Sequence, residues 1–170
     1  MDVKQITSYG ERNPNSPDEL EAFSFLVGKW QGTGRVKLDG GKFADFTVSW
    51  IGRYILDGTA IADELHSLAP DGSPYLGISL RQYDWKRQTW IIEYLNVSNS
   101  FLRRQVNADS GSVIVEGQTV TVISGAPDSM SREHYRVVDQ DNFAYLLDAS
   151  DDGGSSWNEG QIEMTFRRLE

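Results

Sequence analysis

The chain has 170 residues, a length that suits one domain. Its formal net charge of −9 argues against nucleic acid as the main partner, and the absence of cysteine excludes disulfides, thiol catalysis and thiolate metal sites. The apolar stretches are far shorter than the ~20 residues of a membrane helix. The first residues lack a basic region followed by an apolar run, so we expect a cytoplasmic protein with no membrane partner.

One helix is predicted near the N-terminus, in the segment SPDELEAFSFLVG at 16–28. Ser16 is a candidate N-cap, and Glu19 would complete a capping box. Residues 1–15 lack such signals and are expected to form a flexible arm. The apolar stripe of the helix consists of Leu20, Phe23 and Leu26.

Short runs of alternating polar and apolar residues follow the helix to the end of the chain. Turn sequences separate them, including DGG at 39–41 and PDGSP at 70–74. About ten strands in sequence order favour an up-and-down barrel, because closure removes exposed sheet edges. We therefore predict an all-β fold, an antiparallel barrel of about ten strands spanning residues 16–170, with the helix capping one end.

The first predicted strand opens with a glycine- and tryptophan-rich pattern, G-x-W-x-G-x-G, within FSFLVGKWQGTGRV. Trp30 lies on the inward face of this strand and is expected to fill the barrel floor under the helix. The pattern resembles the start of calycin-type barrels, most closely nitrobindin-like proteins. Two later segments, QYDWKRQTW and SDDGGSSW, are similar to a bacterial family of lipocalin-like domains of unknown function. The resemblance implies a ten-stranded barrel with a helix over one end and a lumen for a small ligand.

The likeness to nitrobindins also brings haem into consideration, because those proteins hold the iron through a His near the end of the chain. The last predicted strand, residues 157–168, contains no His, so we expect no haem and no other cofactor. The only two histidines, His66 and His134, are too few for a three-His zinc site, and we expect no metal.

The segment ASDDGGSSW at 149–157 matches both the Asp-box of sialidases and the spacing of an EF-hand calcium loop. A chain of this length is too short for a sialidase propeller, and the flanking residues predict strands rather than helices. We therefore interpret the segment as a turn between the last two strands. Ser150 and Asp152 would hydrogen-bond local amides, and Gly153 and Gly154 would adopt positive φ.

Turn geometry assigns the faces of the first long hairpin. A turn at 57–58 places Trp50 opposite Leu65. The face that contains Trp50 and Tyr54 is then apolar and is predicted to point inward. His66 lies on the other face and is predicted to point to solvent.

The hairpin between residues 75 and 97 has two faces, and neither has the composition of an ordinary solvent-exposed surface. One face contains Arg81, Trp90 and Tyr94, while the other is aliphatic and contains Glu93. We favour the arrangement in which the first face lines the lumen and the aliphatic face packs on a second copy of the chain, giving a homodimer. In the alternative, the aliphatic face is the core and Glu93 is a buried acid or base.

Two further basic groups are candidates for the lumen. His134 shares a predicted face with Arg132 and meets Tyr145 across the next hairpin. It would anchor an anionic group or act as a general base there, or else be hydrogen-bonded within the barrel wall. Arg103 and Arg104 are adjacent, so one must point to each face, and we favour Arg103 as the inward residue.

These features predict a barrel that binds a small amphipathic or aromatic molecule in its lumen. The alternative is a cofactor-free lyase, isomerase or cyclase that uses the lumen as its active site, with His134 or Glu93 transferring protons. No motif separates the two functions, because such a fold hosts both. The candidate ligand-binding residues are Trp50, Tyr54, Arg81, Trp90, Tyr94, Arg103, His134 and Tyr145.

Overall fold

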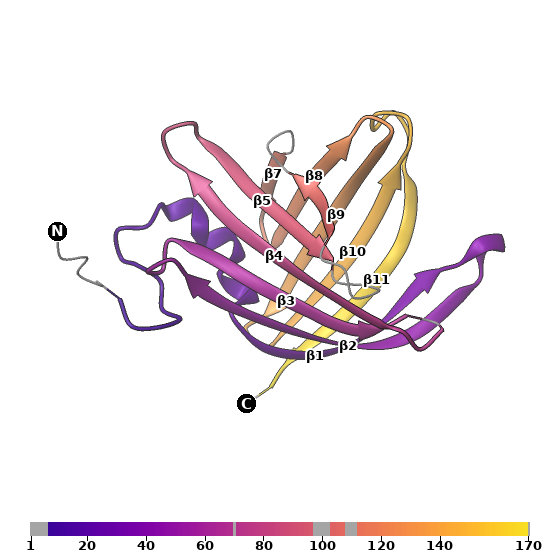
Figure 1. The fold of residues 1–170 in the computed structure, drawn as a ribbon, viewed down its shortest axis with the longest axis horizontal. Helices are drawn as coiled ribbons and strands as arrows, with labels where there is room; N and C mark the ends of the chain where they lie inside the picture. The colour runs from indigo at the N-terminus through magenta and orange to yellow at the C-terminus, as the bar shows by residue number, and fades with distance from the viewer. Residues whose placement is uncertain (1–6, 70, 97–102, 108–111, 170) are drawn as a thin grey trace.

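The computed structural model describes residues 7–69, 71–96, 103–107 and 112–169, with only the backbone described for 103–107 (Figure 1). Within these ranges the chain forms two 3-10 helices and eleven strands. None of the described helices is long and apolar enough to cross a lipid bilayer. In chain order the elements are η1 (Asp18–Leu26), β1 (Gly28–Lys37), η2 (Asp39–Gly41), β2 (Phe43–Ile55), β3 (Ala60–Leu68), β4 (Pro74–Asp84), β5 (Thr89–Asn96), β6 (Arg103–Asn107), β7 (Ser112–Glu116), β8 (Thr119–Ala126), β9 (Ser129–Asp139), β10 (Asn142–Ser150) and β11 (Asn158–Arg168).

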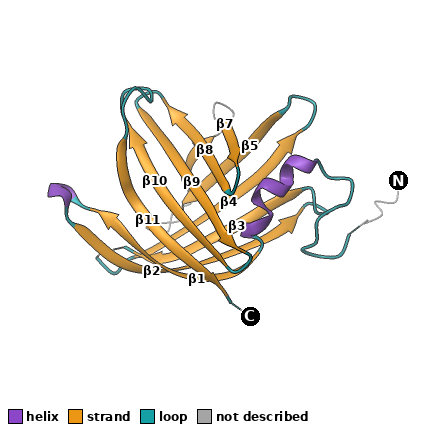
Figure 2. Ribbon diagram, turned by 180° about the vertical axis from the view of Figure 1, so that it is seen from behind, coloured by secondary structure: helices purple, strands orange, loops and turns teal. Residues whose placement is uncertain are grey.

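All eleven strands belong to one antiparallel sheet, in the order β6-β5-β4-β3-β2-β1-β11-β10-β9-β8-β7. Strands adjacent in sequence pair with each other, and β1 also pairs with β11. The two edge strands approach the opposite edge, since β6 lies near β8 and β7 lies near β5. The sheet therefore curls into a nearly closed barrel, and Figure 2 shows η1 at one of its ends. The predicted all-β, up-and-down barrel is confirmed.

The predicted N-terminal helix is present as the 3-10 helix η1, but its predicted cap is absent. Instead of capping the helix, the Ser16 hydroxyl accepts a hydrogen bond from Arg12 Nε at 3.0 Å. Glu19 does not close a capping box and lies close enough to Tyr83 to influence the pKa of that phenol. The apolar stripe was predicted correctly, because Leu20, Phe23 and Leu26 are fully buried.

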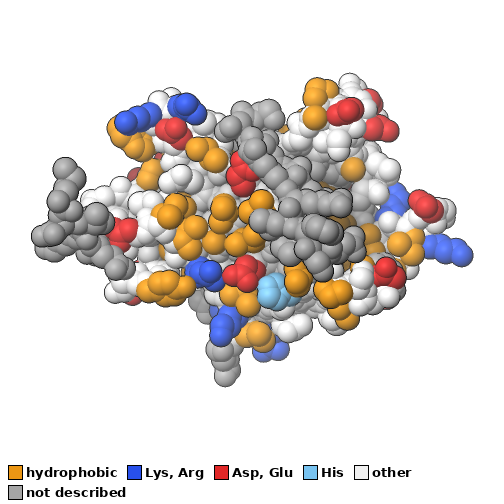
Figure 3. All heavy atoms as spheres, viewed as in Figure 1, with side chains coloured by type: hydrophobic (Ala, Val, Ile, Leu, Met, Phe, Trp, Pro, Cys, Tyr) orange, Lys and Arg blue, Asp and Glu red, His pale blue; other side chains and the backbone are white. Residues whose placement is uncertain are grey.

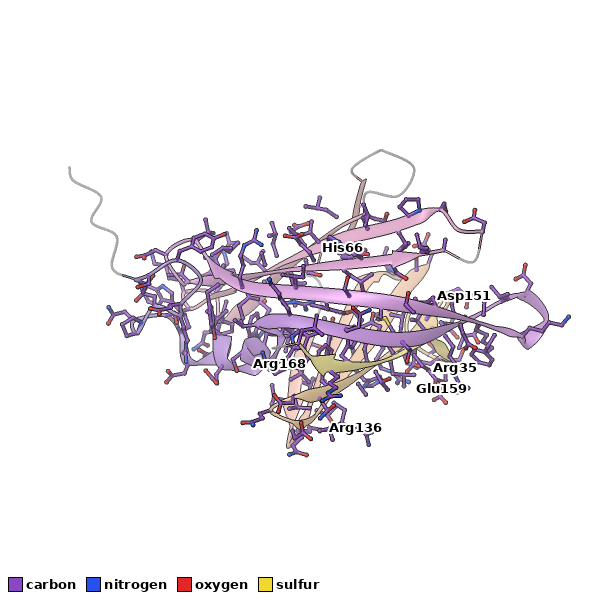
Figure 4. The ribbon with its side chains drawn as sticks, turned by 90° about the horizontal axis from the view of Figure 1, so that it is seen from below. Arg35, His66, Arg136, Asp151, Glu159 and Arg168 are labelled. Atoms are coloured by element: carbon purple, nitrogen blue, oxygen red, sulfur yellow. The ribbon has the colours of Figure 1, made fainter. Side chains whose placement is uncertain are left out.

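The end of η1 and the first strand close the floor of the barrel. A Cβ atom at Gly52 would lie 2.1 Å from the Leu26 carbonyl oxygen, so only glycine lets β2 approach the helix end this closely. Trp30 is buried and donates from Nε1 to the same carbonyl at 3.1 Å. The Arg168 guanidinium lies 4.0 Å above the Trp30 ring and donates to the Val27 carbonyl at 2.8 Å. Figure 4 shows Arg168 at this end of the barrel. The predicted position of Trp30 is confirmed.

The turn between β10 and β11 has the hydrogen bonds predicted for it. The Ser150 hydroxyl accepts from the Gly154 amide at 2.9 Å, and Asp152 Oδ1 accepts from the Ser156 amide at 2.9 Å. Gly153 and Gly154 have φ angles of 73° and 83°. The segment therefore serves as a turn that joins the last two strands.

The N-terminal arm contacts the turn between β2 and β3 from Thr7 onward. The Thr7 amide donates to Asp57 Oδ1 at 3.0 Å, and the Asn13 amide donates to the Gly58 carbonyl at 3.0 Å. Residues 1–6 lie outside the described part of the chain. The described portion of the arm is thus tied to the barrel.

Candidate functional site

The barrel contains a cavity of about 310 Å³ in the half that lies away from η1. Val36, Phe46 and Leu68 line it from the ends of β1, β2 and β3 that are remote from the helix. Its volume lies at the lower end of the range of about 300–1,000 Å³ that is typical of small-molecule sites. Six aromatic residues are among the described residues that line it: Phe46, Trp50, Tyr75, Tyr94, Tyr135 and Tyr145.

The polar and aromatic face of β4 and β5 lines this cavity. Arg81 and Tyr94 are among the lining residues. Leu80 and Glu93 are paired on the opposite face, so the alternative in which Glu93 lies inside the barrel is wrong. Hydrophobic side chains gather over β4 and β5 on the surface shown in Figure 3, and their packing on a second copy stays a prediction.

The register predicted for β2 and β3 is confirmed, with Trp50 opposite Leu65. Trp50 is 3% exposed and lines the cavity. Tyr54 is also buried, but the described cavity walls do not include it, and it is close enough to Arg12 and Glu21 for their charges to affect its pKa. His66 is exposed, as predicted.

Trp90 occupies a similar position beneath the helix. Its ring lies 4.9 Å from the Phe23 ring of η1 in an edge-to-face contact. It is not among the described residues that line the cavity. Trp90 and Tyr54, two of the residues predicted to bind ligand, therefore pack in the floor of the barrel.

The inward orientation predicted for His134 is wrong because a bulge shifts the register of β9 and β10. Asn142 pairs with Asp139, but the next residue, Phe143, pairs with Val137 and leaves Val138 unmatched. Each remaining residue of β9 therefore faces the side opposite to the one expected. His134 points to the outer wall, and its neighbours Glu133 and Tyr135 line the cavity.

On the outer wall His134 belongs to a hydrogen-bonded cluster around Asp148. His134 Nε2 lies 3.3 Å from Asp148 Oδ2, and its Nδ1 lies 3.1 Å from Thr121 Oγ1. Arg132 donates to the same carboxylate oxygen at 2.8 and 3.0 Å, and the Gly160 amide donates to Oδ1 at 3.0 Å. Burial opposes ionisation of Asp148, but these donors prevail and lower its pKa. The cluster matches the second interpretation of His134, a residue hydrogen-bonded within the barrel wall.

A charged network inside the cavity links three strands, β3, β4 and β9. Arg81 donates to Asp63 from Nε at 2.7 Å and from Nη2 at 3.3 Å. Its Nη2 also donates to the Tyr135 hydroxyl at 3.2 Å, which in turn donates to Glu133 Oε2 at 2.5 Å. Tyr145 also lies close enough to Glu133 to influence the pKa of its carboxyl group. We call Asp63, Arg81, Glu133 and Tyr135 the lumen network.

Burial changes the tendency of several cavity residues to ionise. Burial raises the pKa of Glu133, although Arg81 and Tyr135 act in the opposite direction. Burial also raises the pKa values of Tyr135 and Tyr145 well above the usual value of 10.0, so both phenols stay neutral. Burial disfavours the charged form of Arg81, but Asp63, Tyr135 and Glu133 together more than offset it and raise the pKa of Arg81.

Sequence reasoning missed three members of the lumen network, for different reasons. Asp63 is two residues from Leu65 and shares the strand face predicted to point inward, so the alternation of residues could have predicted its inward position. Glu133 and Tyr135 lie inside only because of the bulge, which no sequence feature signalled. Arg103 pairs with Asn96 in β6, and its side chain lies outside the described part of the structure.

The described residues do not provide a His ligand for haem iron. Neither His66 nor His134 is among the residues that line the cavity. Among the residues with described side chains, no group of three or more His, Cys, Asp or Glu residues is arranged to hold a metal ion. The cavity residues therefore do not fit the His-ligated haem that the resemblance to nitrobindins would imply.

Comparison with protein-family models finds no match, and comparison with curated protein sequences finds none either. Among solved structures, the crystal structure of Rv2717c from M. tuberculosis superposes with a TM-score of 0.60 at 16% identity, covering 92% of this chain and 100% of that one. The structure of EF1p2_mFAP2b bound to DFHBI overlaps at a TM-score of 0.41 and 11% identity, covering 87% and 97% of the two chains. The first similarity supports the barrel fold, and the second is too loose to support an argument.

Proposed function

We propose that the protein binds a small amphipathic or aromatic molecule in the lumen of its barrel. The observation that carries the proposal is the indole N–H of Trp50, which has no hydrogen-bond partner although the side chain is buried. It is the one such group among the described buried side chains, and Trp50 lines the cavity. Because an unsatisfied buried donor costs about 1–3 kcal/mol, a ligand with an acceptor oxygen or nitrogen would remove that cost.

The chemistry of the walls supports the same function. Apolar side chains such as Leu65 and Ile162 surround a few polar groups, which is the usual composition of a small-molecule site. The opening G-x-W-x-G-x-G pattern supports a relationship to nitrobindin-like proteins, while the absence of a His in the described cavity walls favours an organic ligand over haem.

The test compares two tryptophan substitutions on opposite faces of neighbouring strands. Leu65→Trp would fill part of the cavity, whereas Leu76→Trp adds the same bulk to the outer face. Native mass spectrometry of the purified protein identifies any retained small molecule, and a thermal-shift screen with aromatic compounds finds others. We expect binding in the wild type and in Leu76→Trp, and its loss in Leu65→Trp. Equal binding by both variants would place the ligand outside the lumen and contradict the proposal.

A second candidate function is proton-transfer catalysis in the same cavity. The observation that favours it is the hydrogen bond of 2.5 Å between Tyr135 and Glu133, a carboxyl group whose pKa is raised by burial. Glu133 would take the role first considered for His134 and Glu93. Incubating a retained ligand with the protein in D₂O tests it by mass spectrometry. Deuterium incorporation that Glu133→Gln abolishes would support an enzyme, and a ligand that remains unlabelled would contradict one.

A further inference from the structure

The charged residues in the described lining of the cavity comprise two acids and one base. Asp63, Arg81 and Glu133 are the charged residues among its described lining. Arg81 and Asp63 form a bidentate pair in which both carboxylate oxygens are engaged. The basic group is therefore already matched, and Glu133 is the acid left over. An anionic ligand would meet a neutralised arginine and a surplus carboxyl group, which disfavours it.

Aromatic rings surround the surplus acid. Tyr135 hydrogen-bonds Glu133, Tyr145 lies close enough to influence its pKa, and the two tyrosine rings are 5.1 Å apart. The Trp50 ring lies 6.2 Å from Tyr135 and 6.1 Å from Tyr145. All three rings line the cavity, and the negative faces of such rings attract cations. Aromatic rings near a carboxylate are the groups that recognise organic ammonium ions.

The remaining phenols close the opposite wall without adding charge. Tyr94 donates from its hydroxyl to the hydroxyl of Tyr75 at 3.1 Å. Burial raises the pKa of Tyr94 far above the usual range, so its hydroxyl stays neutral, and the pair contributes ring surface to the wall. The unpartnered Trp50 N–H adds one donor, which suits an oxygen acceptor elsewhere on the ligand.

We propose that the ligand of the cavity is an organic cation, an aromatic or amphipathic molecule with one ammonium group that lies beside Glu133 and against the rings of Trp50, Tyr135 and Tyr145. This inference rests on the proposed lumen-binding function and narrows its ligand class. Binding of the cation requires the ionised form of Glu133. The other titratable or charged groups that face Glu133 among the described residues are Asp63, Arg81, Tyr94, Tyr135 and Tyr145.

Three probes that share one phenyl ring separate charge from shape. Phenyltrimethylammonium is a permanent cation, tert-butylbenzene is its neutral counterpart, and benzenesulfonate is an anion. Isothermal titration calorimetry with the wild-type protein should show the cation binding about tenfold more tightly than the neutral compound, with no measurable binding of the anion. In Glu133→Gln the preference for the cation should fall to about threefold or less. The control Glu163→Gln removes a carboxylate from the outer wall, where it pairs with Arg35, and should keep the full preference.

A pH series provides a readout that does not depend on a variant. Because phenyltrimethylammonium cannot lose a proton, its affinity should rise with pH as Glu133 ionises, while the affinity for tert-butylbenzene stays constant. Equal affinity for the cation and the neutral compound would overturn the cation proposal and leave lumen binding intact, provided that Leu65→Trp abolishes both. Binding of benzenesulfonate in preference to the cation would also overturn it. If none of the three probes binds at millimolar concentration, the cation proposal fails. Whether the lumen binds any ligand is then decided separately, by the screen for retained ligands.

Discussion

Arg81 and Asp63 form a bidentate ion pair inside the barrel, with both side chains at most 2% exposed. The pair joins neighbouring strands β4 and β3, and it places the guanidinium against the Phe23 ring at 4.7 Å. Such a pair contributes little when intact but is costly to break, since one partner is left as an isolated buried charge. Breaking the pair would therefore both destabilise the barrel and change the polar side of its cavity.

We expect Asp63→Asn to destabilise the protein by about 3–5 kcal/mol, because it leaves Arg81 charged and unpaired. Urea denaturation measures the change. The double variant Asp63→Leu/Arg81→Met removes both charges. Its loss in the free energy of unfolding should be much smaller than the sum of the losses in the single variants Asp63→Leu and Arg81→Met. The exposed pair of Arg35 and Glu163, with a separation of 2.8 Å, is the control, and breaking it should cost about 1 kcal/mol or less. Additive losses in the double variant would contradict this account of the pair.

Trp30 should be one of the most sensitive positions of the barrel floor. Trp30→Ala removes a buried ring, its hydrogen bond to Leu26 and its contact with Arg168, and we expect a loss of about 3–5 kcal/mol. The control is Trp85→Ala, since Trp85 is 66% exposed in the turn between β4 and β5 and should change stability by about 0.5 kcal/mol or less. A loss below about 1 kcal/mol for Trp30→Ala would show that the floor does not depend on this residue.

The sequence predicted the barrel and the face of each long hairpin wherever the turn determined the register. The turn at 57–58 correctly placed Trp50 opposite Leu65, because strand pairing on both sides of it is uninterrupted. In the same way, the alternation of residues in β4 placed Arg81 on one face and Leu80 on the other. Period-two alternation carries this information whenever no residue is inserted.

The candidate site was less accessible to sequence reasoning, because one extra residue in β9 reverses its faces. With Val138 unmatched, Tyr135 rather than His134 enters the cavity. A bulge depends on how the strand fits its neighbours and has no sequence signature here. Arg81 was predicted to line the lumen, but its ion pair with Asp63 was missed, since an acidic residue in a strand pattern is normally assigned to solvent unless its partner is known.

The turn between β10 and β11 should be stabilised by Asp152 at neutral pH. Hydrogen bonds from Ser156 and Ser150 lower the pKa of Asp152 from 3.8 to about 2. Because the folded-state pKa is depressed, this stabilisation is present above the unfolded value and is lost as pH falls through about 2. Asp152→Asn should therefore lower the Tm near neutral pH, with a difference that shrinks as the pH falls from 3.8 to about 2. Asp151→Asn, which changes the exposed neighbour labelled in Figure 4, should leave the Tm unchanged. A constant difference for Asp152→Asn across this range would contradict the assignment.

His134 lies on the outer wall, so its loss should not affect the contents of the cavity. We expect His134→Ala to bind any lumen ligand as tightly as the wild type, because its two polar contacts are to Asp148 and Thr121. Titration calorimetry with a ligand retained by the purified protein, or with phenyltrimethylammonium, measures this. Tyr145→Leu, which removes a ring from the cavity wall on the neighbouring strand, is the matched comparison and should weaken binding. A loss of affinity in His134→Ala would place this side chain in the ligand site.

Glu133 should make the ligand-free protein less stable as the pH rises. Burial raises the pKa of its carboxyl group in the folded state above the ordinary value of 4.5. The favourable contribution of the protonated form is therefore fully present below 4.5 and is lost as the pH rises through the folded-state pKa. Glu133→Gln mimics the protonated acid at every pH, so it should be more stable than the wild type at neutral pH and match it in acid. Thermal denaturation across this range measures the difference, with Glu163→Gln in the same buffers showing what a change on the outer wall does. If Glu133→Gln were less stable than the wild type at neutral pH, the carboxylate would be stabilised in the folded state, and burial would not be the dominant influence on the pKa of Glu133.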